Sequence, residues 1–175
     1  MKNKNQLSLF EAEQATPPDN KQVESTPWRL FIDGASRNNP GPSGVGIHLI
    51  KDDTPVLNKG FYVGTKTNNQ AEYLGLIIGV FLLENYMKPF DHIQINADSQ
   101  LLVRQMQGIY KIKNPALKRY TQCAKKLLEA YNHTFNHVMR EKNVMADALA
   151  NKGVDNKIIL PTPIITHLKD YDILV

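Results

Sequence analysis

Three strand-like segments in succession, followed by segments that alternate between helical and strand periodicity, constrain the fold of this chain most strongly. The predicted strands cover residues 28–32, 45–51, 55–63, 92–97 and 133–139. The predicted helices cover residues 67–88, 99–107, 117–131 and 144–152. This order is typical of a mixed sheet with helices on its faces, so we predict an α/β fold.

Polar residues at the ends of these segments set their predicted limits. The run RNNPGPSG, residues 37–44, is dense in turn-forming residues and predicts a loop. Asn69, with Glu72 three positions later, matches a helix N-cap and its capping-box partner. Asp98 and Asn143 are expected to cap the short helix and the last helix.

The chain has 175 residues, of which 42% are hydrophobic and 22% charged, as in an ordinary globular domain. Residues 1–27 are polar and contain three prolines, so they predict a flexible N-terminal extension. Residues 28–153 form the predicted folded domain, and residues 154–175 form a C-terminal tail that is apolar enough to dock on it.

The cysteine count and the apolar runs indicate in which cellular compartment the protein is expected. Cys123 is the single cysteine, which excludes an internal disulfide and a zinc finger built on several cysteines. The longest apolar run, 74–83, is too short to span a bilayer, and the N-terminus lacks the pattern of a signal peptide. We therefore expect a cytoplasmic protein without a membrane partner.

Positive charge is concentrated in one stretch. The formal net charge is only +4, but the stretch Arg104–Lys126 has seven basic residues and no acidic one. Charge of one sign predicts an anionic partner, with the phosphate backbone of a nucleic acid as the leading candidate. A solvated helix face explains the same pattern equally well.

Four carboxylates lie where predicted strands end or predicted helices begin: Asp33, Glu72, Asp98 and Asp147. Each has a local explanation as a turn, cap or first-turn residue. Together they predict a site, because the carboxyl ends of strands gather at one edge of an α/β sheet. Clustered carboxylates repel one another unless cations neutralise them, and Mg²⁺ or Mn²⁺ suits oxygen ligands. Two such ions about 4 Å apart support phosphoryl displacement by water.

Four blocks of the sequence resemble the type 1 ribonuclease H family, in family order and over about residues 28–153. They are FIDGASRNNPGPSGVGI, TNNQAEYLGLIIGV, NADSQLLVRQMQGIYKIKNP and HVMREKNVMADALAN. The resemblance implies a ribonuclease H-like fold, with a five-stranded mixed sheet flanked by helices. It also implies an endoribonuclease that cuts the RNA strand of RNA–DNA hybrids and leaves 5′-phosphates, in primer and R-loop removal. We expect a monomer, although the sequence leaves dimerisation open.

The same resemblance assigns roles to individual residues. Asp33, Glu72, Asp98 and Asp147 match the catalytic acids that hold two Mg²⁺ ions, for which Mn²⁺ can substitute.

Further matches concern nucleic-acid binding. Asn39 matches an asparagine that contacts the hybrid's minor groove, and Asn68 and Gln100 match residues that read sugars and base edges. Thr67 and Asn114 match a pocket that grips a DNA phosphate. Turn, cap and solvated-helix roles explain Asn39, Asn68 and Gln100 as well.

The sequence departs from many bacterial members in the spacing between the last two acids. Asp98 and Asp147 are 49 positions apart, which leaves little room for the basic insertion found in those members. Hybrid binding is then expected to depend on the Arg104–Lys126 stretch, in particular on Lys111 and Lys113.

A second departure concerns the group that assists turnover. His137 precedes Asp147 by ten positions, like the mobile histidine of the family. Its block, HVMRE, resembles a shorter-looped branch in which an arginine takes this role, and Arg140 matches that arginine. We favour Arg140, because a flexible reach suits a loop residue better than a strand residue.

The N-terminal extension contains a second resemblance. Residues 6–10, with Gln6, Leu7, Leu9 and Phe10, resemble the short peptide by which bacterial replication and repair proteins hold the sliding clamp. A chance match or docking on the protein's own surface are alternatives, since short motifs match often.

Three other functions fit parts of the sequence. A non-catalytic nucleic-acid-binding module on the same fold would be expected to lose a carboxylate, whereas all four are present. A different two-metal nuclease fits the TNNQAE and DSQ blocks poorly. A protein-interaction scaffold would use the basic stretch alone.

Overall fold

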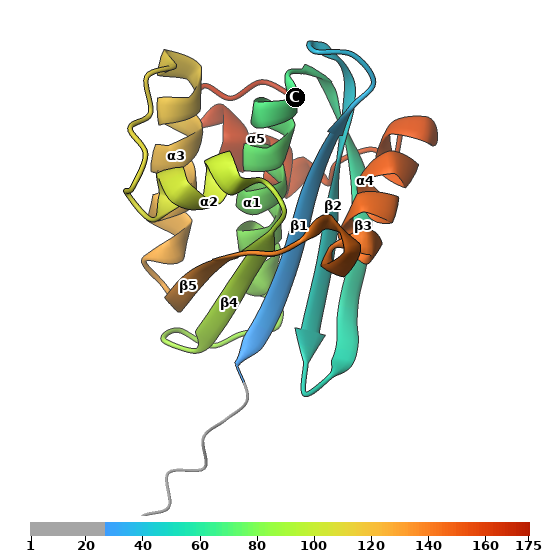
Figure 1. The fold of residues 1–175 in the computed structure, drawn as a ribbon. Coiled ribbons are helices and arrows are strands. Elements are labelled where there is room, and N and C mark those ends of the chain that lie inside the picture. The colour runs from blue at the N-terminus through green and yellow to red at the C-terminus, as the bar shows by residue number, and fades with distance from the viewer. Residues whose placement is uncertain (1–26) are drawn as a thin grey trace, which may run out of the picture.

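The computed structural model describes residues 27–175 and contains one five-stranded sheet (Figure 1). The strands are β1 (Trp28–Ser36), β2 (Gly41–Lys51), β3 (Thr54–Lys66), β4 (His92–Ala97) and β5 (Asn132–His137). Their order across the sheet is β3-β2-β1-β4-β5. The first three strands pair antiparallel, whereas β4 pairs parallel with both β1 and β5. The predicted mixed sheet is confirmed.

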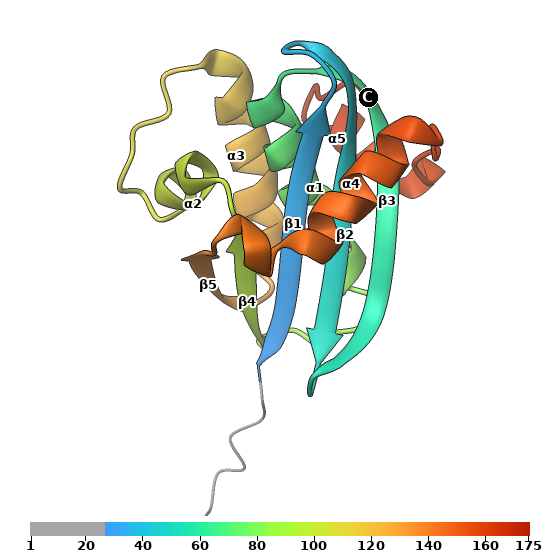
Figure 2. The same ribbon diagram turned by 45° about the vertical axis from the view of Figure 1, so that its right-hand side comes forward.

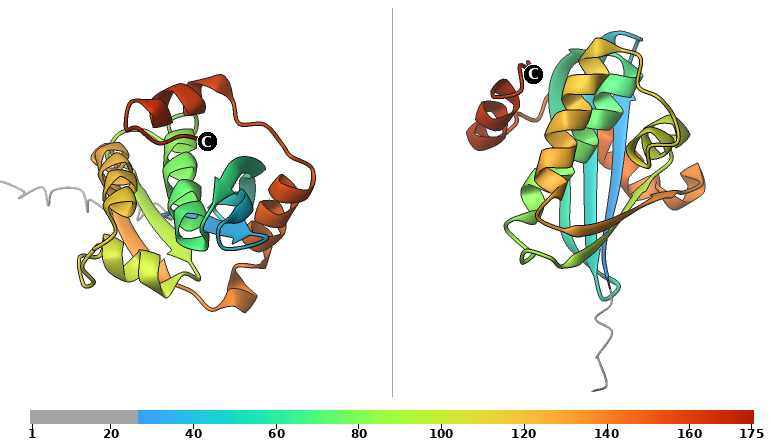
Figure 3. Two further views of the ribbon diagram at one scale, coloured as in Figure 1. Left: turned by 90° about the horizontal axis from the view of Figure 1, so that it is seen from above. Right: turned by 90° about the vertical axis from the view of Figure 1, so that its left-hand side faces the viewer.

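Helices cover both faces of this sheet. They are α1 (Asn68–Leu83), α2 (Gln100–Met106), α3 (Pro115–Leu128), α4 (Val144–Asp155) and α5 (Thr162–Lys169). Helix α4 crosses β2 and β3 on one face, while α1, α3 and α5 lie on the other (Figures 2 and 3). Within residues 27–175, none of the helices has both the length and the apolar character needed to span a membrane.

Two glycines let helices approach the sheet closely enough to form a site. A Cβ at Gly34 would lie 2.2 Å from the backbone nitrogen of Glu72, so α1 meets β1 next to Asp33. Gly46 is the register partner of Asp33, and a Cβ there would lie 1.9 Å from the carbonyl oxygen of Ala146. Helix α4 therefore starts close to Asp33 on β1.

Several predicted boundaries were wrong. The segment predicted as a loop over 37–44 is shorter, because β2 begins at Gly41. Helix α1 is capped by Thr67, whose capping-box partner is Gln70, and not by Asn69 and Glu72. Ser99, not Asp98, caps α2. Glu72 and Asp98 therefore take no part in capping. The hydroxyl groups of Thr67 and Ser99 accept the hydrogen bonds of the helix N–H groups instead.

The C-terminal residues add to the core. Ile164 and Leu168 of α5 are buried, and Ile173 after it is buried too. The ring of His167 lies 5.1 Å from the ring of Phe81 on α1, and its Nε2 lies 3.6 Å from the Cys123 sulfur on α3. The predicted docking thus takes place on α1 and α3.

Candidate active site

Three carboxylates converge beside the carboxyl-terminal half of β1. Asp33 lies on β1, Asp98 directly follows β4, and Glu72 lies in the second turn of α1. One oxygen of each lies within 4.8 Å of the others. They meet because β1 and β4 are parallel, with Asp33 and Asp98 each two positions beyond their last pair, Phe31 and Asn96, and because Gly34 lets α1 approach.

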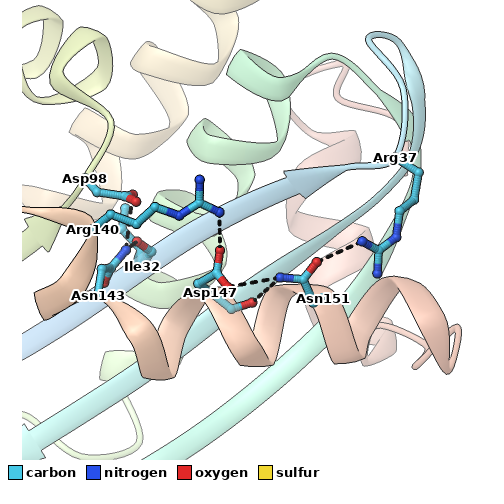
Figure 4. Close-up of polar contacts among 7 residues, drawn as sticks. All are labelled: Ile32, Arg37, Asp98, Arg140, Asn143, Asp147 and Asn151. Carbon is cyan, nitrogen blue, oxygen red and sulfur yellow. Dashed lines mark hydrogen bonds and ion pairs between the residues drawn. The ribbon is translucent and has the colours of Figure 1, made fainter.

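The fourth acid, Asp147, lines the same cavity from the first turn of α4. Its Oδ1 accepts a hydrogen bond from the Arg140 guanidinium at 2.9 Å. Its Oδ2 accepts one from Asn151 Nδ2 at 3.2 Å (Figure 4). The four acids that the sequence singles out thus share one cavity.

Burial sets the electrostatics of this cavity. Burial, together with the negative charges of Asp98 and Asp147, raises the pKa of Asp33 to about 7. Burial also raises the pKa of Glu72 well above its usual range, with Asp33 and Asp98 adding to the effect. Both carboxyls are therefore unfavourable as anions in the absence of a nearby positive charge.

The donor set fits a divalent cation. Glu72 Oε2 is buried and has no hydrogen-bond partner within the described part of the chain. Asp33, Asp98 and Asp147 add further carboxylate oxygens around the same space. Hard oxygen ligands of this kind suit Mg²⁺ or Mn²⁺, and a cation would neutralise the repulsion among them.

Asn143 fixes the position of Asp98. It occupies the N-cap position of α4, but its side chain makes no capping bond, contrary to the prediction. Its Nδ2 instead donates to the carbonyl oxygen of Ile32 at 2.9 Å and to Asp98 Oδ1 at 3.2 Å. Asn143 is 1% exposed, so this buried amide holds α4, β1 and Asp98 together.

The two candidates for assisting turnover lie differently. Arg140 is in a 3₁₀ turn, Arg140–Lys142, and its side chain is 77% exposed beside Asp147. His137 is the last residue of β5, and its Nε2 lies 3.2 Å from the backbone oxygen of Asp98. Arg140 bonds the Asp147 carboxylate directly, whereas the hydrogen bond of the His137 side chain among residues 27–175 is to the backbone.

Most of the predicted nucleic-acid contacts have structural roles as well. Thr67 caps α1, and Asn114 caps α3 by accepting from the backbone nitrogens of Ala116 and Leu117. Asn39 Oδ1 accepts from the backbone nitrogen of Asn68 at 3.0 Å, which ties the β1–β2 connection to α1.

The remaining three predicted contacts lie around α2. Gln100 is the exposed first residue of this helix, and Lys111 and Lys113 are exposed between α2 and α3.

Three side chains of this site were not predicted as site residues: Arg37, Asn151 and Asn143, which was expected only as a helix cap. A usable signal was present, since Asn143, Asp147 and Asn151 are spaced by four and therefore share one helix face. Arg37 gave no such signal, because it lies in a turn-rich run far from α4 in sequence.

Known proteins share this fold and sequence pattern. Residues 31–153 match the family described as reverse transcriptase-like. Ribonuclease H of Pseudomonas fluorescens is 33% identical over 144 residues, which cover 72% of this chain and 89% of that protein. The chain belongs to the ribonuclease H family.

Solved ribonuclease H structures agree with this assignment. The ribonuclease H1 of Halobacterium salinarum superimposes with a TM-score of 0.71 at 38% identity, over 75% of this chain and 99% of that one. LC11-RNase H1, solved in complex with an RNA/DNA hybrid, superimposes with a TM-score of 0.69 at 34% identity, over 74% and 97%. These relatives are type 1 enzymes.

For two further relatives, the chain spans less than two thirds of the relative's own length. Ribonuclease HI of Halobacterium salinarum is 39% identical over 128 residues, and the match covers 72% of this chain and 63% of that protein. The match to a bifunctional protein of Mycobacterium tuberculosis, also 39% identical, covers 35% of that protein.

Proposed function

We propose that this ribonuclease H domain hydrolyses the RNA strand of RNA–DNA hybrids as a divalent-cation-dependent endonuclease. The observation that carries the proposal is the convergence of Asp33, Glu72 and Asp98 around the unpartnered, buried Glu72 oxygen. A buried acidic cluster of this kind is unfavourable unless a cation occupies it. Family membership supports an RNA–DNA hybrid as the substrate, because the relative LC11-RNase H1 binds an RNA/DNA hybrid.

Asp33, Glu72, Asp98 and Asp147 are the residues that would hold two Mg²⁺ ions, with Mn²⁺ as a substitute. When bound, such ions activate a water molecule and stabilise the leaving oxygen of a phosphodiester. In the protein itself, Asn143 fixes the Asp98 carboxylate. The exposed Arg140 offers a guanidinium to a phosphate oxygen at the cavity mouth.

The substrate interface is proposed to run from the cavity across α2. Asn39, Asn68 and Gln100 supply amides that can hydrogen-bond sugars and base edges, including the 2′-hydroxyl that distinguishes RNA from DNA. Thr67 and Asn114 supply helix N-termini suited to a phosphate. Lys111 and Lys113 add exposed positive charge.

Salt dependence tests this interface. Replacing Lys111 and Lys113 with alanine should weaken hybrid binding and lower the slope of log affinity against log salt by roughly 1.8, for two lost phosphate contacts. Fluorescence anisotropy with a labelled hybrid measures the slope. An unchanged slope would mean that neither lysine contacts a phosphate of the hybrid.

A cleavage assay tests the proposed activity directly. Labelled RNA–DNA hybrid, single-stranded RNA, double-stranded RNA and double-stranded DNA are each incubated with the protein and Mg²⁺. We expect internal cuts in the RNA of the hybrid, with 5′-phosphate and 3′-hydroxyl ends, and no cuts when EDTA is present. Binding of the hybrid without hydrolysis would instead support the alternative of a non-catalytic nucleic-acid-binding module.

The sliding-clamp peptide lies outside the described residues and stays a prediction. We propose that Leu9 and Phe10 enter an apolar pocket of the clamp while Gln6 sets the register and Leu7 adds contact. Changing Gln6, Leu9 and Phe10 to alanine should abolish clamp binding and leave hydrolysis of short hybrids unchanged. No binding by the unsubstituted protein at tens of micromolar would contradict it. A monomeric, cytoplasmic enzyme acting on primers and R-loops is part of the same proposal.

A further inference from the structure

The two oxygens of Asp147 have chemically different partners (Figure 4). Oδ1 accepts from Arg140, a cation on an exposed turn. Oδ2 accepts from Asn151, a neutral amide one helical turn further along α4. Asn151 Nδ2 also donates to the backbone oxygen of Asp147 at 2.9 Å, so the amide is tied to the same residue twice.

Arg37 determines which way the Asn151 amide points. Its Nη1 donates to Asn151 Oδ1 at 3.0 Å, while its Nη2 pairs with Asp155 at the end of α4. A guanidinium has donors only, so it accepts no hydrogen bond from the amide nitrogen. The carbonyl of Asn151 therefore faces Arg37, and its NH₂ group faces the Asp147 carboxylate.

We propose that Asn151 is a positioning residue for Asp147 and that Arg37, reaching across from the β1–β2 connection, fixes the orientation of its amide. This inference rests on the proposed function only in that Asp147 belongs to the cation site. Arg140 is itself a cation and competes with a metal ion for Asp147. The neutral Asn151 amide holds Oδ2 without such competition, so it preserves the carboxylate geometry that a cation needs at Oδ1.

Calorimetric titration of the full chain with Mn²⁺, together with hybrid hydrolysis at varied Mg²⁺, tests the proposal. Asn151→Ala, and the similarly shaped Asn151→Leu, should each weaken Mn²⁺ binding and lower kcat by about tenfold, as for a lost hydrogen bond to a charged group. KM for hybrid should change little. Lys152→Ala is the matched control, because this exposed neighbour on α4 lies outside the cavity lining.

A double-mutant cycle tests the role of Arg37. Arg37→Ala alone should reduce Mn²⁺ affinity and kcat by a few-fold, whereas adding it to Asn151→Ala should change neither further. Additive losses would overturn the orienting role, and so would an effect of Arg37→Ala confined to KM, which would report a phosphate contact.

The binding measurement separates this proposal from the proposed function. Mn²⁺ affinity equal to that of the unsubstituted protein in both Asn151 variants overturns the positioning role, whether or not hybrid is cut. If the unsubstituted protein binds Mn²⁺ but cuts no hybrid, the proposed function fails, while the difference in Mn²⁺ affinity still decides the role of Asn151. Thermal melting of each variant verifies that the fold is retained.

Discussion

The two halves of the carboxylate cluster are stabilised in opposite ways. Asp33 is buried in the sheet–helix junction and Glu72 has a buried oxygen there, and burial is the chief cause of the raised pKa values of both. At the rim, Asp98 is held by Asn143, and Asp147 is held by Arg140 and Asn151. The buried half thus carries a repulsion that a cation would relieve, whereas the rim half already has its donors and a counter-charge.

The largest expected effect comes from neutralising the buried half. Asp33→Asn should abolish hybrid hydrolysis and, in EDTA at pH 8, raise the free energy of unfolding by up to about 4 kcal/mol, because a buried charge is removed. Urea unfolding and a hybrid cleavage assay measure the two effects. Asp147→Asn is the matched rim variant, and it should lose activity without this gain, since it also loses its ion pair with Arg140. An equal increase in the free energy of unfolding in both variants would show that the buried half and the rim half do not differ in this way.

The pH dependence of stability sharpens the same comparison. Folded Asp33 keeps its proton to about pH 7, whereas the unfolded chain releases it near 3.8, so the folded state binds more protons between these values. Its contribution is therefore full below about pH 4 and is lost as pH rises through 7, at about 1.4 kcal/mol per pH unit.

Melting temperature against pH in EDTA measures this loss. Mg²⁺ at pH 8 should restore stability, because it binds only the folded site. Asp33→Asn should make the profile less steep, with the contribution of Glu72 remaining, because the pKa of that carboxyl is raised as well. A profile that stays as steep in this variant would place the titrating group elsewhere.

The rim half depends on how closely α4 approaches the sheet. Gly46→Ala would place a Cβ 1.9 Å from the Ala146 carbonyl oxygen, so α4 must shift. We expect a loss of about 1–3 kcal/mol in stability, with activity reduced more than the unfolded fraction explains. Gly108→Ala is a useful contrast, since no atom lies near its Cβ position and only its positive φ resists substitution. Its activity should be preserved in the folded fraction.

The smallest effects concern the two candidates for assisting turnover. Arg140→Ala should lower kcat by about tenfold, as for a lost charge-assisted hydrogen bond. His137→Ala should change kcat less than about threefold, because its ring nitrogen lies against the Asp98 backbone and not a carboxylate oxygen. Steady-state hydrolysis of one hybrid by both variants decides between them. The reverse ranking would assign the role to His137.

The sequence by itself predicted the mixed sheet and the four acids of the cavity, because apolar periodicity and strand ends are local features. It predicted the caps of α1 and α2 wrongly, since Thr67 and Ser99 compete with the acids for the same N–H groups. The acidic side chains were left free for the cavity as a result.

Only the tertiary structure decided which acids are buried and which have donors. The sequence assigned Asn143 to capping and gave Asn151 and Arg37 no role, yet these three hold the rim. Burial and hydrogen bonding across elements depend on how helices pack on the sheet. The raised pKa of Asp33 depends first on burial and then on charges that lie up to 114 positions away along the chain, so it emerges only once the chain is folded.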